Sequence, residues 1–486
     1  MSILSRAASF LCVALTAVNS ACERSVCLDD CPLPPPPERG SATVTINAAD
    51  TQGPILTGGG ANFSGLAAYV DTSHARLDLL AQMPYALNRV HFSGEVLDAS
   101  DNTKVDILVT HLPQPSPPPA PWDFEWMDRA VAAANAIRDQ GGADFIMSIH
   151  RAPPWMTPSA GPASTSSWQS SYATYCARLV SYYNKGSFVD DAGRTVTSPT
   201  GPAHIAYWEI WNEPNVSDTN VAPLGADQFV LLFAQVTSAM RAVDPTIKIG
   251  GPSTRSDIGD SLDYLKALMS GGGQVDFLTI NQYQADPKLP DAQAFQIASV
   301  LKDRPTTTLP IVIGEANSEL DDTQERTGSA FEWAVMPLLY KSHIELHTWR
   351  VIRWETYQHE YDLIDMASGL PRTTYWMERT FWAPIAMGGT RVACSPSSRD
   401  VACLANLTPG HKLNVVLINI GVGSPSDNRG PGVRHEVDVV LADGLARTFA
   451  IRTIDRDTPA AGPMPSIGSG RGVVINGYGM ATLQEN

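Results

Sequence analysis

The chain has 486 residues, of which 43% are hydrophobic and 17% are charged. This composition is typical of a globular protein, and the length allows a large catalytic domain with a smaller one beside it. A net charge of −16 argues against nucleic acid and anionic membrane surfaces as partners.

The first 41 residues are predicted to be an export signal and a linker. Arg6 precedes the apolar run Ala7–Val18, which is typical of a signal peptide and too short to span a membrane. We assign residues 1–21 to this signal and the proline-rich residues 22–41 to a stiff linker. At Cys22, lipidation and plain cleavage are both open. Either way, the sequence predicts a secreted or cell-envelope protein of bacterial type, with no transmembrane segment.

Seven cysteines are present, one of them in the predicted signal. Cys394 and Cys403 flank a polar loop and would suit a disulfide in an oxidising compartment. Cys27 and Cys31 form a second candidate pair. Cys176 lies in a helical pattern and is expected to be a buried thiol.

No metal site is predicted. The cysteine spacings do not resemble a structural zinc site. His343, Glu345 and His347 would align on one face of a strand, but no third convincing ligand accompanies the two histidines. A structural role is therefore favoured for these residues.

Residues 55–387 alternate short apolar runs with amphipathic helical stretches, a pattern that indicates βα units and a parallel sheet. Eight units fit a (β/α)₈ barrel of the TIM type. The expected strands are Ile55–Thr57 with the following glycines, Ala86–Phe92, Phe145–His150, Tyr207–Trp211, Ile247–Gly250, Phe277–Tyr283, Ile311–Glu315 and Ile344–Trp349. The expected helices are Asp123–Asp139, Ser167–Tyr183, Ala226–Val243, Asp260–Ser270, Asp291–Leu301, Thr327–Tyr340 and Trp376–Ala386.

Residues 388–486 change to short strands and turns, which predicts an accessory C-terminal β-sandwich. Its expected strands are Leu413–Asn419, His435–Leu441, Thr448–Thr453 and Val473–Ile475. Residues 42–54 contain a further strand-like segment, and we expect it to join this domain from the N-terminal side.

The segment Trp208–Asn215 reads Trp-Glu-Ile-Trp-Asn-Glu-Pro-Asn. Side chains alternate along a strand, so Glu209, Trp211 and Glu213 are expected on one face. Pro214 has no backbone donor and should stop the strand just after Glu213. A carboxylate at the carboxyl end of a barrel strand lies where such barrels keep their chemistry.

A second apolar run, residues 310–317, ends in Glu315. The separation is 315 − 213 = 102 residues, and a barrel unit averages roughly 31. The two glutamates are therefore about three units apart, which is consistent with strands 4 and 7. Glu319 is the rival second carboxylate, disfavoured because Asn317 and Ser318 suggest that the strand has already ended.

Two carboxylates at one cleft are the minimal apparatus of glycoside hydrolysis. One must carry a proton and the other must be ionised, so their environments must differ. Glu213, near Trp211, is the better candidate acid. Arg89 and Tyr283 could keep Glu315 ionised by charge and hydrogen bonding. Glu209 lies deeper in its strand and is expected to be a structural carboxylate of the barrel interior, paired with Arg89.

Trp208–Asn215 together with Glu315 resembles the clan of retaining (β/α)₈ glycoside hydrolases. Within that clan the chain most resembles family 39, which includes β-xylosidases and α-iduronidases. The resemblance covers roughly residues 55–390. Supporting segments are Asn88–Phe92, Ile249–Pro252, Tyr361–Asp365 and Tyr375–Trp376.

The resemblance implies roles for individual residues. Glu213 would be the acid/base and Glu315 the nucleophile. Asn212 would bind the 2-hydroxyl of the sugar, and Arg89 and Tyr283 would position the nucleophile.

The sugar platform would be Trp349, with Trp354 as second choice. His91 and His150 are further candidates for sugar contact or, equally, satisfied core histidines. Trp155 would either flank the cleft or pack beside it.

The chain departs from the family pattern at two positions. Asn281 stands where the clan usually has His, two residues before the strand 6 tyrosine. Ala316 follows the nucleophile where the family tends to have Trp. Both changes alter the sugar pocket, so they leave the identity of the sugar open.

The sequence therefore predicts an exported, retaining, β-xylosidase-like glycoside hydrolase that acts on a carbohydrate substrate without a cofactor. An endo-acting β-glycanase of the same clan is one alternative. A non-catalytic carbohydrate-binding protein is the other, because a fold alone does not establish activity.

Overall fold

The computed structural model describes residues 39–63, 75–91, 95–97, 104–106, 122–149, 152, 156, 166–216, 224–255, 261–271, 274–283, 309–318, 329–356, 362–365, 367–386, 388–421, 432–459 and 461–486. All of them belong to one compact unit, Glu38–Asn486. Several sequence predictions lie outside the described residues, namely those for Cys22, Cys27, Cys31, His150, Trp155, Glu319 and the helix Asp291–Leu301.

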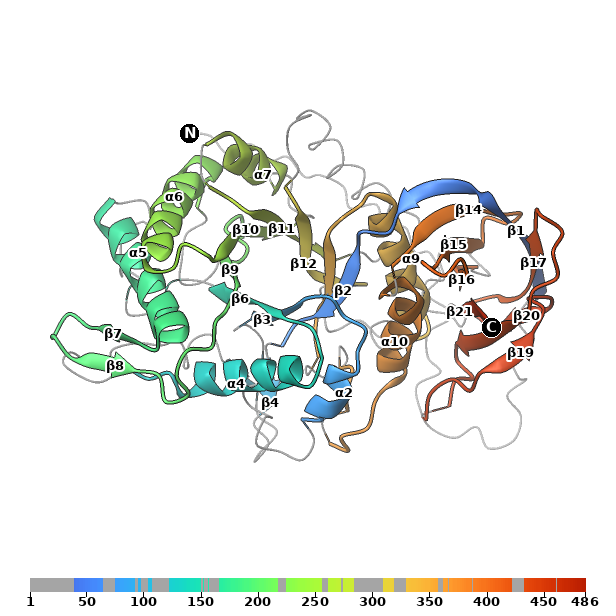
Figure 1. The fold of residues 1–486 in the computed structure, drawn as a ribbon, viewed down its shortest axis with the longest axis horizontal. Helices are drawn as coiled ribbons and strands as arrows, with labels where there is room; N and C mark the ends of the chain where they lie inside the picture. The colour runs from blue at the N-terminus through green and yellow to red at the C-terminus, as the bar shows by residue number, and fades with distance from the viewer. Residues whose placement is uncertain are drawn as a thin grey trace, which may run out of the picture. The chain divides into compact units, whose positions relative to one another are not determined.

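An eight-stranded parallel sheet forms the barrel (Figure 1). Its strands in spatial order are β2 (Gly58–Ala61), β13 (Arg350–Arg353), β12 (Ile311–Asn317), β11 (Phe277–Tyr283), β10 (Lys248–Arg255), β9 (Tyr207–Ile210), β6 (Phe145–Ile149) and β3 (Asn88–His91). Asn62 and Arg89 form a parallel bridge, and the Phe63 N–H donates to the Arg89 carbonyl at 2.9 Å. These contacts join β2 to β3 and close the sheet, so the predicted TIM barrel is confirmed.

The glycines of β2 allow this closure. A Cβ placed on Gly60 would lie 1.7 Å from the Leu87 carbonyl oxygen. Only a residue without a side chain lets the two backbones approach so closely.

The helices between the strands cover the outside of the barrel (Figure 1). They are α2 (Leu77–Ala81), α4 (Glu125–Asp139), α5 (Ser166–Val180) with its π-helical extension η2 (Ser181–Lys185), α6 (Ala226–Val243), α7 (Ser261–Ser270), α9 (Glu332–Glu345) and α10 (Thr373–Ala386). Buried positions in α6 recur every three or four residues, as at Phe229, Phe233, Val236 and Met240, which is the pattern of a helix that packs on one face. Two small hairpins accompany the barrel, β4 (Glu95–Leu97) with β5 (Lys104–Asp106) and β7 (Ser187–Val189) with β8 (Thr195–Thr197). In the part of the chain described here, no helix has the length and apolar character needed to cross a bilayer.

The eighth strand differs from the prediction. The expected strand Ile344–Trp349 is instead the end of α9 and a turn, in which His347 has φ of 58°. The strand itself, β13, reads Arg-Val-Ile-Arg. Its arginines conceal its burial in the sequence, because Arg353 is fully buried and ion-paired with Glu332 of α9.

A nine-stranded sheet contains the C-terminal residues. Its spatial order is β19 (Ser466–Gly468), β18 (Phe449–Ile454), β21 (Gly479–Glu485), β16 (Leu413–Asn419), β15 (Val401–Leu407), β14 (Thr390–Pro396), β1 (Arg39–Pro54), β17 (Arg434–Leu441) and β20 (Val473–Ile475). The N-terminal strand β1 pairs antiparallel with β14 and parallel with β17. The strands therefore form one continuous hydrogen-bonded sheet, which includes the N-terminal strand as expected.

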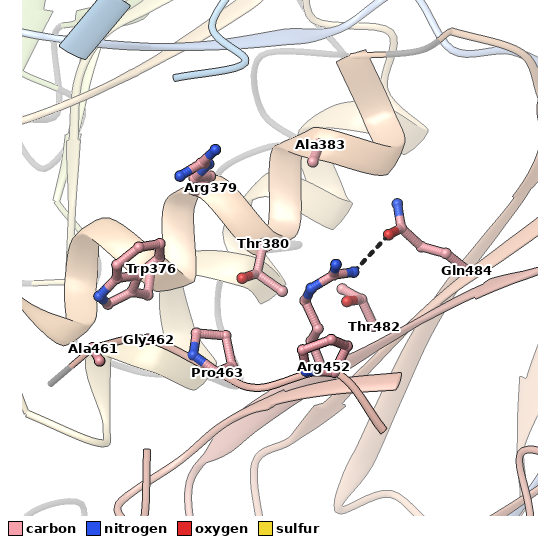
Figure 2. A pocket seen from close by; sticks show the side chains of 11 residues that line it. Trp376, Arg379, Thr380, Ala383, Arg452, Ala461, Gly462, Pro463, Thr482 and Gln484 are labelled. Carbon is pink, nitrogen blue, oxygen red and sulfur yellow. Dashed lines mark hydrogen bonds between the residues drawn. The ribbon is translucent and has the colours of Figure 1, made fainter. Parts of the chain in front are cut away.

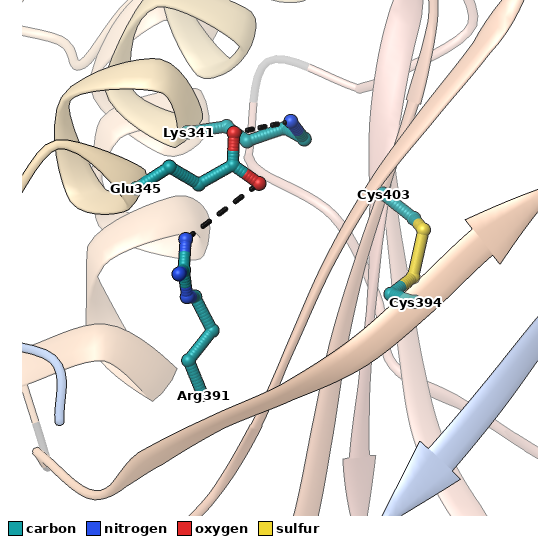
Figure 3. Close-up of a disulfide and its surroundings, with 5 residues drawn as sticks. All are labelled: Lys341, Glu345, Arg391, Cys394 and Cys403. Atoms are coloured by element: carbon teal, nitrogen blue, oxygen red, sulfur yellow. Dashed lines mark hydrogen bonds and ion pairs between the residues drawn. A yellow bond between two sulfur atoms is a disulfide. The ribbon is translucent and has the colours of Figure 1, made fainter. Parts of the chain in front are cut away.

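A disulfide joins Cys394 of β14 to Cys403 of β15, with their Cα atoms 6.1 Å apart (Figure 3). On the neighbouring helix α9, Glu345 forms ion pairs with Lys341 and with Arg391 of β14 (Figure 3). Cys176 of α5 is a buried free thiol, and burial raises its pKa well above the ordinary range.

Candidate active site

The strand that carries Glu213 ends earlier than the sequence predicts. β9 stops at Ile210, and the backbone then takes left-handed conformations at Trp211 and Glu213, with φ of 71° and 51°. Such conformations are uncommon for residues other than glycine and collect at functional sites. The Glu213 N–H donates to the Ser253 carbonyl at 3.0 Å, which fixes this turn against β10.

The turn changes the environment of Trp211, which was expected in the barrel interior. The Trp211 ring lies 5.4 Å from that of Tyr172 and 6.2 Å from that of Trp168, both on α5. The period-two alternation no longer applies beyond Ile210, so Trp211 points outward while Glu209 stays inside.

Arg89 on β3 is the hub of the barrel interior and is fully buried. Its Nε donates to Glu209 Oε2 at 2.7 Å, and one terminal nitrogen donates to Glu315 Oε1 at 3.0 Å. Burial lowers the pKa of Arg89, but Glu209 and Glu315 outweigh this effect and raise it above its usual value. The predicted pairing with Glu209 and the predicted contact with Glu315 are therefore both present.

Glu315 on β12 is 4% exposed. Burial raises the pKa of its carboxyl group, while the Arg89 guanidinium and the Tyr283 hydroxyl pull in the opposite direction. Tyr283 donates to Glu315 Oε2 at 2.6 Å. Each oxygen of this carboxylate thus has its own donor, which is the support that an ionised nucleophile needs.

Asn281 on β11 connects the two carboxylates. Its Cα is paired in register with that of Glu315, and its Nδ2 donates to Glu213 Oε1 at 3.1 Å. The same nitrogen donates to Asn212 Oδ1 at 3.2 Å, and Arg89 donates to that oxygen at 3.0 Å. The orientation of the Asn212 amide is therefore fixed, with its nitrogen left as a donor for another group.

Sequence reasoning missed Ser253, which is fully buried on β10. Its hydroxyl donates to Asn281 Oδ1 at 2.7 Å, and its carbonyl accepts the Glu213 N–H described above. The signal available in the sequence was its position at the end of strand 5, directly after Gly251-Pro252. Asn62 and Ser148 were missed in the same way; both accept hydrogen bonds from Arg89, at 3.1 Å each.

The sugar-platform role expected for Trp349 is wrong. Its ring lies 5.8 Å from Tyr207 and 6.3 Å from Phe277, the first residues of β9 and β11. These residues mark the amino-terminal end of the barrel, opposite the carboxylates, so Trp349 cannot form the sugar platform. The second choice, Trp354, follows β13 directly, and its N–H donates to the Ala316 carbonyl at 2.9 Å.

The histidine candidates divide into two groups. His91 closes β3, but its side chain and all of His150 and Trp155 lie outside the described residues.

His343 is buried on α9, where its ring nitrogens contact Thr348 and Gln282. Burial lowers the pKa of His343 to about 3, so the ring is neutral. Among the residues with described positions, no group of three or more His, Cys, Asp or Glu side chains could hold a metal ion.

Part of the chain matches a known family model. Residues 159–303 match the model of glycosyl hydrolases family 39. The matched region contains Glu213 and Tyr283 and ends before Glu315. The resemblance to family 39 predicted from the sequence is thus confirmed.

A curated relative, the β-xylosidase of Caldicellulosiruptor saccharolyticus, is 29% identical over 110 residues. The aligned segment spans only 22% of this chain and 22% of that protein.

Solved structures resemble the whole chain. A monomeric β-xylosidase from Caulobacter crescentus has a TM-score of 0.61 at 14% identity, with 91% of this chain and 99% of that chain covered. The family 39 enzyme from Xanthomonas axonopodis pv. citri has a TM-score of 0.60 at 14% identity, with 93% and 98% covered. A glucosidase from Croceicoccus marinus has a TM-score of 0.59 at 16% identity, with 92% and 98% covered. At these identities the similarity shows the fold.

Proposed function

We propose that this protein is a retaining glycoside hydrolase of β-xylosidase type, with Glu213 as acid/base and Glu315 as nucleophile. The observation that carries the proposal is the arrangement around Asn281, whose amide bonds Glu213 while its strand is in register with Glu315. Asn281 therefore connects the glutamate that follows strand 4 with the strand that carries the glutamate of strand 7. The match to the family 39 model supports the same chemistry.

The reaction follows from the environments of the two carboxylates. Glu315, ionised by its contacts with Arg89 and Tyr283, attacks the anomeric carbon as protonated Glu213 gives its proton to the leaving oxygen. Glu213, now ionised, then takes a proton from water, which hydrolyses the covalent glycosyl-enzyme. The Asn212 nitrogen is oriented to donate to the 2-hydroxyl, a contact that strengthens in the transition state.

The test is a panel of aryl glycosides, including the β-xyloside and β-glucoside, with the anomeric proton of the first-formed sugar followed by NMR. Retained configuration is expected. Inverted product would contradict double displacement, and a lack of hydrolysis of any glycoside or polysaccharide would favour the carbohydrate-binding alternative. Products from a xylo-oligosaccharide series distinguish the alternatives further, since an endo-acting enzyme would release internal fragments.

Tyr283→Phe should move the acidic limb of the kcat/KM profile to higher pH. The Tyr283 hydroxyl lowers the pKa of Glu315, so its loss raises that pKa further and the nucleophile becomes protonated at higher pH. A hydrogen bond to a charged group is worth about 1.5–3 kcal/mol, so the limb should shift by about 1–2 pH units. Tyr182→Phe is the control: it removes a hydroxyl that donates to Asp128, and it should leave the profile unchanged.

Ser253→Gly should move the basic limb of kcat/KM to higher pH. Glycine accepts the φ of 55° at this position without strain, so the variant removes little besides the hydroxyl. Asn281 would then no longer be held with its nitrogen toward Glu213, and a carboxyl group that loses a donor keeps its proton to higher pH. The variant also removes a 3.4 Å contact from Arg89 to the Ser253 hydroxyl, but Arg89 keeps its shorter bonds to Glu209 and Asn212. If Ser253 acts through Asn281, adding Ser253→Gly to Asn281→Ala should cause no further shift; an additive shift would refute the coupling.

We also propose the domain organisation and location. Residues 55–387 are the catalytic barrel, and residues 388–486 with the strand in 42–54 form a β-sandwich. One hydrophobic cluster supports the sandwich, because it includes residues from strands near both ends of the sheet order, such as Val439 of β17 and Phe449 of β18. Export through residues 1–21, with 22–41 as linker, fits the Cys394–Cys403 disulfide, which persists in oxidising compartments. The mass of the mature N-terminal peptide would test cleavage and acylation at Cys22.

A further inference from the structure

A cavity lies between α10 and the nine-stranded sheet. It has a volume of about 370 Å³ and is lined by Trp376, Arg379, Thr380, Ala383, Arg452, Ala461, Gly462, Pro463, Pro465, Thr482 and Gln484 (Figure 2). None of these residues belongs to the carboxylate site. The volume is within the range of small-ligand sites.

The helix α10 explains how the cavity is built. Glu378 and Trp382 are buried on one side of the helix, where a Cβ on Gly59 of β2 would contact the Trp382 ring. Trp376, Thr380 and Ala383 recur at intervals of four and three residues, so they share the other side. That side faces the sheet, and next to Trp376 it carries only the small residues Thr380 and Ala383.

The sheet provides the opposite wall. Along β21, Thr482 and Gln484 line the cavity, while Ala481 and Leu483 belong to the hydrophobic core of the sheet. Arg452 of the neighbouring strand β18 donates to Gln484 Oε1 at 2.9 Å. Figure 2 shows the Arg452 guanidinium and the Thr380 side chain facing the same space.

The charge of the lining is positive. Two arginines and no acidic residue line the cavity, in a chain whose net charge is −16. Within the described part of the chain, the hydrogen-bond partner of Arg452 is an amide and not a carboxylate. The other N–H groups of its guanidinium can bind one carboxylate through two parallel hydrogen bonds.

The tryptophan of the cavity acts as a fixed wall and not as an open stacking surface. A Cβ on Gly462 would lie 2.6 Å from the Trp376 ring, so the backbone there covers the indole closely. The Arg379 guanidinium carbon lies 5.8 Å from the ring centroid. Recognition in this cavity therefore depends on hydrogen bonds and charge.

Arg379 also lines the cavity, but its side chain contacts Tyr375 and points away from Arg452 (Figure 2). We propose that this cavity is an accessory site for an acidic saccharide, with Arg452 binding its carboxylate and Thr380, Thr482 and Gln484 binding its hydroxyl groups. The choice of a saccharide over other carboxylates rests on the proposed glycosidase function. The site would hold a uronic acid unit of a polysaccharide while the barrel acts on another part of the chain.

The test is isothermal titration of the full chain with glucuronate, glucose and inorganic phosphate. Glucuronate should bind, glucose should bind at least about tenfold more weakly, and Arg452→Gln should weaken glucuronate binding at least about tenfold. Arg471→Gln is the control, because Arg471 is an exposed arginine of the same domain, 56% accessible and ion-paired with Asp438. It should leave binding unchanged. All Arg variants should keep wild-type activity on aryl glycosides.

Glucuronate binding that is equal in wild type and Arg452→Gln would overturn the proposal, as would glucose binding of equal strength. Phosphate that binds as tightly and resists displacement by glucuronate would indicate a simple anion site and would also overturn it. Glucuronate is also titrated into Glu315→Gln, which is expected to be inactive, so that binding at the accessory site is measured independently of the proposed hydrolysis. Aryl glycoside hydrolysis without glucuronate binding defeats only the accessory site, whereas Arg452-dependent binding in a protein that cleaves no glycoside supports the site and defeats the function.

Discussion

Glu315→Gln is expected to lower kcat for every substrate by at least about 10⁴-fold, a loss typical of removing a catalytic nucleophile. The amide has the shape of the carboxylate but cannot form the glycosyl-enzyme ester. Arg89 keeps its contact with Glu209, so the guanidinium is not left buried without a counter-charge. We therefore expect a folded variant, and its thermal unfolding midpoint should be measured alongside its kinetics.

The control for this variant is Glu319→Gln, which removes the rival carboxylate and should keep most of the activity. A 2-fluoro aryl glycoside, which slows hydrolysis of the covalent intermediate, should label the peptide that contains Glu315. Wild-type activity in Glu315→Gln, or a label on another peptide, would refute the nucleophile assignment.

The sequence was sufficient to place the two carboxylates because regular structure connects them. An apolar run that ends in a glutamate needs only the repeat of the barrel to be assigned to a strand. Glu213 lies in the turn directly after β9, and Glu315 lies near the carboxyl end of β12. Arg89 and Tyr283 could be anticipated for the same reason, since each sits on a strand whose apolar pattern is clear.

Sequence reasoning failed where tertiary contacts override local pattern. Ile344–Trp349 alternates like a strand, yet its first residues continue α9. The true strand ends in Arg353, whose burial is compensated by Glu332 and Glu378 on the surrounding helices. The error shifted Trp349 to the wrong end of the barrel. Ser253 was missed for another reason: a serine becomes informative only when the partners of its hydroxyl and carbonyl are known.

Glu213→Ala should affect substrates according to their leaving groups. A poor leaving group needs the proton from Glu213, so its hydrolysis should fall by about 10²–10⁴-fold. A dinitrophenyl glycoside departs without that proton, so the glycosyl-enzyme should still form and then accumulate, since no base activates water. A burst of dinitrophenolate followed by slow turnover is the expected measurement. An equal loss for both kinds of substrate would argue against the acid/base role.

Added azide distinguishes the two carboxylates by stereochemistry. In Glu213→Ala, azide can occupy the space of the lost carboxylate and attack the glycosyl-enzyme, so the rate should rise and the glycosyl azide should have the configuration of the substrate after two displacements. In Glu315→Ala, azide can only attack the substrate directly, and one displacement gives the opposite configuration. If the two configurations were exchanged between the variants, the roles assigned to Glu213 and Glu315 would have to be exchanged as well.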